Sequence, residues 1–174
     1  MEYVELNNAP KGEMKVFKNV EDFVLWENRT RFSMELTTEE ATLILAYIKA
    51  RGYILCAYDQ DTLSIKNLEE SETLDVEELV RRVCNWNYEL LLDNTITGEQ
   101  HKKYLQDAEL ISNVLDRCGA RDGYCIETPT IKEMLTILNK FPEDYRVTCC
   151  GGWNYLYLFS ESKTITIDCE RYLG

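Results

Sequence analysis

The chain has 174 residues and a mass of 20.4 kDa, which is long enough for one domain or two small ones. Apolar residues make up 45% of the sequence, and it holds only 8 Gly and 3 Pro, so its composition excludes a disordered or collagen-like chain. The 19 Lys and Arg against 31 Asp and Glu give a formal net charge of -12, which excludes the basic footprint of a protein that binds nucleic-acid phosphates.

Three short elements are expected before residue 37. Residues 14–17 and 31–36 look like strands, because apolar and polar side chains alternate in them. Residues 20–27 lie between them and are ambiguous, although their apolar side chains would suit a short helix.

A capped helix followed by a hairpin is the clearest pattern in the sequence. Thr37 and Glu40 form a capping box, and a broad apolar face follows until Gly52, which suits a left-handed residue after a helix end. This predicts a helix over residues 38–51. Two strand-like runs within residues 53–67 then flank a polar turn, which predicts the hairpin.

Residues 68–78 form an acidic run that contains no basic residue. Apolar residues at helical spacing predict a helix over about residues 75–86, whose acidic first turn complements the helix dipole. Residues 88–93 could extend this helix or form a strand. The acids of the run are Glu69, Glu70, Glu72, Asp75, Glu77 and Glu78.

A third helix and the elements after it are expected in the second half of the chain. Thr97 and Gln100 begin a predicted helix that ends at Gly119, and residues 120–128 read as a connection. A helix is expected from Pro129 to Phe141. Three strand-like runs separated by hairpin-length turns then predict a helix packed on a three-stranded antiparallel meander. These runs are residues 145–150, 154–160 and 164–168.

This order of elements predicts an α+β fold, with helices packed on antiparallel hairpins and meanders in two small subdomains. The expected divisions are an acidic α+β subdomain at 1–94, a helical connection at 95–122, and the helix with its meander at 123–174.

No catalytic, metal or cofactor residue is predicted. The spacing of the seven Cys disfavours both a disulfide framework and a zinc site, so reduced thiols are expected. The single His, His101, reads as a solvated helix residue, and no phosphate loop, dinucleotide fingerprint or nucleophile elbow is present. Because no targeting signal or apolar run of about 20 residues is legible, a cytoplasmic protein is expected.

The anionic charge is concentrated in the first half of the chain. Residues 1–94 hold 19 acids and 10 bases, a net charge of -9. If the acidic run lay along a helix, its six charges would be spaced about 2.5 Å apart, close to the roughly 1.7 Å of duplex DNA. The run, together with aromatic residues of the kind enriched in interfaces, is therefore the predicted partner-binding surface. Those aromatic residues are Trp153, Tyr155 and Tyr157.

Two segments carry a family resemblance. The sequence from Phe141 to Val147, FPEDYRV, resembles a unit that recurs in uncharacterised small proteins of bacterial phages and conjugative elements. Residues 36–93, with YILCAY and CNWNYEL, are similar to proteins of such elements in gut-dwelling Gram-positive bacteria. The resemblance implies a mobile-element setting, in which small acidic proteins often inhibit host restriction or CRISPR nucleases.

The resulting hypothesis is a non-enzymatic acidic protein that binds another protein, in the narrower case the nucleic-acid groove of a defence nuclease. It predicts no direct binding to nucleic acid or membranes and leaves the oligomeric state open. The alternatives are an enzyme that uses carboxylates in a pocket the sequence does not locate, and a plain accessory interaction domain.

Overall fold

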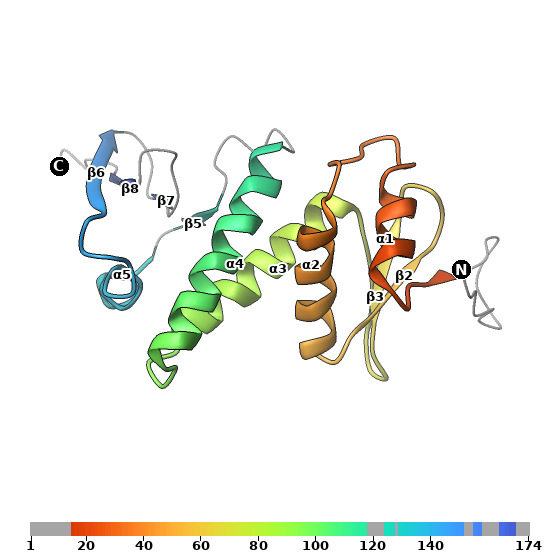
Figure 1. Cartoon of the computed structure of the whole chain (residues 1–174), viewed down its shortest axis with the longest axis horizontal. Coiled ribbons are helices and arrows are strands. Elements are labelled where there is room, and N and C mark those ends of the chain that lie inside the picture. The colour runs from red at the N-terminus through yellow and green to blue at the C-terminus, as the bar shows by residue number, and fades with distance from the viewer. Residues whose placement is uncertain (1–14, 118–123, 128, 152–154, 158–163, 170–174) are drawn as a thin grey trace. The chain divides into compact units, whose positions relative to one another are not determined.

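The computed structural model describes residues 15–117, 124–127, 129–151, 155–157 and 164–169 (Figure 1). It confirms the α+β class, with helices and an antiparallel sheet. Contacts divide the chain into two units, Met1–Val83 and Cys84–Gly174. The divisions predicted from the sequence at residues 94 and 122 stay predictions.

The first unit is built on a four-stranded antiparallel sheet of order β1-β2-β3-β4. The strands are β1 (Lys15–Val16), β2 (Ile54–Ala57), β3 (Leu63–Lys66) and β4 (Ser71–Leu74). The predicted hairpin is confirmed as β2 and β3, with Leu55 opposite Ile65. Sheet residues such as Leu63 and Ile65 are fully buried, and they form the core together with Phe23, Ile44 and Leu79 from the helices.

Two capped helices, α1 (Val20–Glu27) and α2 (Thr38–Ala50), lie side by side in this unit (Figure 1). The Asn19 side chain accepts a hydrogen bond from the Asp22 N–H at 2.9 Å, which fixes the start of α1. The capping box of Thr37 and Glu40 is present at the start of α2. Gly52 has a φ of 77°, a left-handed conformation that suits glycine.

The strand predicted at residues 31–36 is wrong, because this segment is a loop with no ladder partner. The carboxylate of Glu27 binds the Met34 N–H, so that N–H is not available to a strand. Glu35 has a φ of 51°, which is incompatible with an extended chain. Local side-chain bonding therefore overrides the alternating pattern.

The acidic run is also not one continuous element. Residues 71–74 form β4, which pairs with β3 through registers such as Ser64 with Thr73. Helix α3 (Val76–Leu91) then begins close to the predicted start. It continues beyond residue 86 because residues 88–91 extend the helix, one of the two alternatives left open by the sequence.

The second unit contains α4 (Gly98–Arg117), α5 (Ile131–Leu138) and a second sheet. The sheet order is β5-β7-β8-β6, with β5 (Cys125–Glu127), β6 (Arg146–Gly151), β7 (Tyr155–Tyr157) and β8 (Thr164–Cys169). The predicted strands are present, but the antiparallel meander is wrong. Strand β7 has β5 and β8 as its neighbours, so β6 pairs instead with the far edge of β8, in parallel. The missed strand β5 lies in the segment expected to be a connection.

A buried polar network joins α3 and α4 to Tyr124, the residue before β5, within the second unit. The Tyr124 hydroxyl donates to the Asn87 side-chain oxygen at 2.9 Å, and the Asn87 amide nitrogen donates to the Tyr104 carbonyl at 3.0 Å. The Tyr124 N–H also points at the Ser112 hydroxyl, at 3.4 Å. Asn87 is 0% exposed, so its hydrogen bonds replace those that water would otherwise provide.

Tyr88 lies beside this network without sharing in it. Its hydroxyl oxygen is buried and has no hydrogen-bond partner among the described residues. Burial, and to a lesser degree the charge of Glu133, raises the pKa of Tyr88 to about 12. The folded protein therefore favours the neutral phenol.

We expect the Tyr88→Phe variant to be as stable as the wild type or up to about 1 kcal/mol more stable at pH 7, because it removes an unpaired buried hydroxyl. Since the folded pKa lies above the unfolded one, the wild type should lose stability relative to the variant as the pH rises from 10 to 12. Urea unfolding at pH 7 and pH 11 measures both effects. If Tyr88→Phe lowered the free energy of unfolding by more than about 1 kcal/mol at pH 7, the Tyr88 hydroxyl would have to be hydrogen-bonded in the folded protein.

Candidate functional site

The predicted acidic surface is split between a turn, a strand and a helix start. Glu69 and Glu70 lie in the turn after β3, and Glu72 lies in β4. Asp75 directly precedes α3, and Glu77 lies in its first turn with Glu78. A strand rises about 3.3 Å per residue against about 1.5 Å for a helix, so the charges are spread more widely than the DNA-like spacing requires.

Most carboxylates of the run are also engaged within the first unit. Glu72 pairs with Arg82, and Glu77 pairs with Arg81 at 3.4 Å. Asp75 and Glu78 form a reciprocal capping box. These four acids therefore stabilise β4 and α3 locally, and they do not form an array of free charges.

The turn at residues 67–70, called the acidic turn below, presents the remaining acids. The Asn67 side chain accepts hydrogen bonds from the N–H groups of Glu69 at 2.8 Å and Glu70 at 2.7 Å, which fixes the turn. Leu68 at its tip is fully exposed. The Tyr53 hydroxyl donates to the Glu70 carboxylate at 2.9 Å, and this bond raises the pKa of Tyr53. Glu69 has no side-chain partner among the described residues.

A second exposed feature is the loop at residues 28–36, called the arginine loop. Phe32 is 76% exposed, and the Arg31 guanidinium carbon lies 5.9 Å from its ring centroid, within cation–π distance. Arg29 is exposed as well. Neither guanidinium has a carboxylate partner in the part of the chain that the structure describes, although the protein has a net charge of -12.

The conformation of the arginine loop is fixed by the side chain of Glu27, which is 0% exposed. Its carboxylate accepts hydrogen bonds from the Met34 N–H at 2.5 Å and the Ser33 hydroxyl at 3.0 Å. The Asp61 carboxylate of the β2–β3 hairpin accepts a bond from the Arg31 N–H at 2.8 Å. The loop is therefore ordered before any partner binds.

Sequence reasoning gave the arginine loop no functional role, because an alternating pattern suggested a strand. The available signal was the sequence NRTRF at residues 28–32, which places two Arg beside an aromatic residue in the acidic half of the chain.

Among the aromatic residues predicted to bind a partner, Tyr155 and Tyr157 lie in β7, opposite Glu127 and Cys125 of β5. Trp153 lies outside the described residues.

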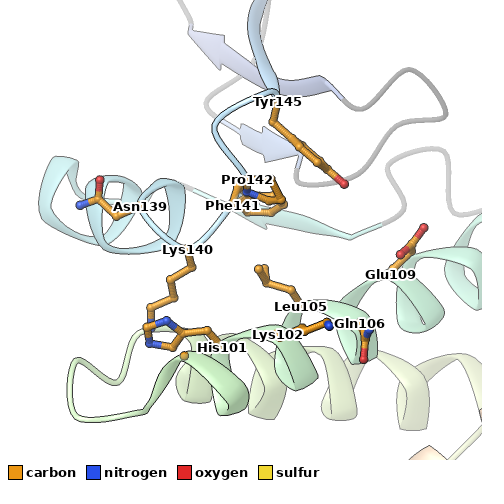
Figure 2. A pocket seen from close by; sticks show the side chains of 11 residues that line it. His101, Lys102, Leu105, Gln106, Glu109, Asn139, Lys140, Phe141, Pro142 and Tyr145 are labelled. Atoms are coloured by element: carbon orange, nitrogen blue, oxygen red, sulfur yellow. The ribbon is translucent and has the colours of Figure 1, made fainter.

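The second unit contains a cavity of about 400 Å³ between α4 and the segment that follows α5 (Figure 2). Leu105 faces Phe141 and Pro142 across it, and His101 lies at one end. Among the described residues that line it, Glu109 is the only one with a carboxylate.

Lys140 reaches along this cavity but is already engaged. Its ammonium group donates to the carbonyl of Leu91 and, at 3.0 Å, to that of Asp93, where α3 ends. Burial lowers the pKa of Lys140. Lys140 thus caps the C-terminal end of α3, and these bonds fix the segment that carries Phe141.

The described residues show neither a cluster of metal ligands nor a membrane-spanning helix. No group of three or more His, Cys, Asp or Glu side chains in the described ranges is placed to hold a metal ion. No described helix is both long enough and apolar enough to cross a bilayer.

Comparison with known protein families, curated proteins and solved structures gave no match.

Proposed function

We propose that this chain is a non-enzymatic binding protein and that the acidic turn contacts a basic partner. The observation that carries the proposal is the fully exposed Leu68 beside Glu69, whose carboxylate has no partner among the described residues. An apolar side chain flanked by charge is suited to a contact in which the apolar group is buried and the charges select the partner.

The rigidity of the turn supports this proposal. Asn67 fixes the backbone of Glu69 and Glu70, and Tyr53 orients the Glu70 carboxylate, so little conformational freedom remains to be lost on binding. The net charge of -12 would also speed encounters with a positively charged partner.

The narrower form of the proposal is that the partner is a nucleic-acid-binding protein, such as a host defence nuclease inhibited by a mobile-element protein. Its support is the acidic charge of the chain and the family resemblance of residues 36–93 and 141–147. The DNA-like array itself is not part of the proposal, because Arg81 and Arg82 pair with two of its six acids.

The test is affinity capture from host lysate, with and without prior nuclease digestion. We expect a basic protein to bind the wild type and not the Glu69→Lys/Glu70→Lys variant, because the reversed charges repel it. Capture should persist or increase after digestion, since nucleic acid competes for the same partner surface.

The matched control is Glu39→Lys/Glu143→Lys, which changes the net charge by the same amount at exposed positions elsewhere. Circular dichroism spectra of both variants check that the fold is kept. The proposal is wrong if the acidic-turn variant and the control capture the same proteins in the same amounts.

A further inference from the structure

We infer that the arginine loop of one copy of the chain binds the acidic turn of a second copy. This inference rests on the proposed binding role of the acidic turn and names one partner for it. Both surfaces lie in the first unit, and both are fixed in place by hydrogen bonds to side chains.

The two surfaces match group by group. The arginine loop offers exposed Phe32 with the guanidinium groups of Arg29 and Arg31, and the acidic turn offers exposed Leu68 with two carboxylates. Contact would place the apolar side chains together and the cations against the anions. Arginine with an aromatic residue is also the composition typical of the energetically dominant part of an interface.

The match cannot be made within one copy. The arginine loop is bonded to the β2–β3 hairpin, because the Asp61 carboxylate accepts a hydrogen bond from the Arg31 N–H. Helix α1, which directly precedes the loop, is bonded to the same hairpin, because the Trp26 ring N–H donates to the Asp59 carbonyl at 3.1 Å. That hairpin precedes β3, whereas the acidic turn follows it. The four residues of β3 therefore separate the two surfaces by about 13 Å of strand.

This separation favours a closed dimer. In a two-fold dimer whose β3 strands run antiparallel, the end of each copy that carries the arginine loop lies beside the end of the other copy that carries the acidic turn. Both contacts then form at once around a two-fold axis, and no complementary surface is left to recruit a third copy.

A single-stranded nucleic acid is the competing occupant of the arginine loop, since Phe32 could stack on a base and the arginines could contact phosphates. The charge of the chain favours the second copy. A single strand carries only anionic phosphates along its length, which the net charge of -12 repels, whereas a second copy has the same net charge but also carries 19 Lys and Arg.

The first experiment is sedimentation velocity of the full chain over a range of concentrations near 0.15 M salt, where repulsion between the copies is screened beyond about 8 Å. We expect a reversible monomer–dimer equilibrium. Arg29→Glu/Arg31→Glu should weaken it at least tenfold, and so should Glu69→Lys/Glu70→Lys, because each variant places like charges in contact. The charge-matched controls, Lys49→Glu/Lys132→Glu and Glu39→Lys/Glu143→Lys, should dimerise like the wild type.

The decisive experiment mixes the two weakened variants in equal amounts. In the mixed dimer, one contact is the wild-type pair and the other has both signs reversed, so both are complementary and dimerisation should return. A wild type that stays monomeric, a mixture that stays monomeric, or a control variant that loses dimerisation would each overturn the inference. So would binding of a fluorescent single-stranded oligonucleotide that Arg29→Glu/Arg31→Glu abolishes. Because these measurements use purified chain alone, they can fail while capture of a basic protein by the acidic turn still succeeds.

Discussion

Replacement of Glu27 by alanine is expected to lower the free energy of unfolding by about 3 kcal/mol. The carboxylate is fully buried and accepts hydrogen bonds from the Met34 N–H and the Ser33 hydroxyl. Its removal takes away the carboxylate that accepts from the buried Met34 N–H and from the half-buried Ser33 hydroxyl. Urea unfolding followed by circular dichroism measures the loss.

Two further variants separate this effect from a general loss of helix α1. Glu21→Ala removes an exposed acid from the first turn of the same helix and should cost about 0.5 kcal/mol. Glu27→Gln keeps an acceptor oxygen and should fall between the alanine variant and the wild type. A Glu27→Ala loss no larger than that of Glu21→Ala would mean that the carboxylate does not hold the arginine loop.

The second large effect is expected for Asn87→Ala, at about 2–3 kcal/mol. Asn87 is fully buried and satisfies both the Tyr124 hydroxyl and the Tyr104 carbonyl, so its loss disturbs three elements of the second unit. Asn85→Ala, on the exposed side of the same helix, should change stability by no more than about 0.5 kcal/mol.

A double-mutant cycle of Asn87→Ala with Tyr124→Phe isolates the hydrogen bond between the two side chains. We expect the two losses to be non-additive by about 1 kcal/mol, because either substitution removes the same bond. Strict additivity, measured by urea unfolding, would show that the hydrogen bond between Asn87 and Tyr124 contributes nothing to stability.

Local chemistry explains which elements the sequence could predict. The capping box of Thr37 and the hairpin after Gly52 depend on residues close in the chain, and both are present. The arrangement of β6 depends on which strands flank β7, a choice made between segments far apart in sequence. No turn signal at residues 151–153 could reveal that β6 pairs in parallel with β8.

The candidate site was predictable only in part. Glu69 and Glu70 could be named because an acidic run is visible in the sequence. The strand β4, which divides this run, could not be predicted, since only Leu74 of that strand is buried. The arginine loop was missed because its conformation depends on one buried carboxylate at Glu27. A charged residue at the end of a helix is usually solvent-exposed, and the sequence alone does not show that Glu27 is buried.

The division of the chain inside α3 has a consequence for the stability of each unit. Val83 ends the first unit and Cys84 begins the second, so eight residues of a sixteen-residue helix belong to each. An isolated helix shorter than about 12 residues is marginal in water. When the two units are expressed separately, each half of α3 has only the packing within its own unit to hold it, so each unit is expected to be less stable alone than in the whole chain.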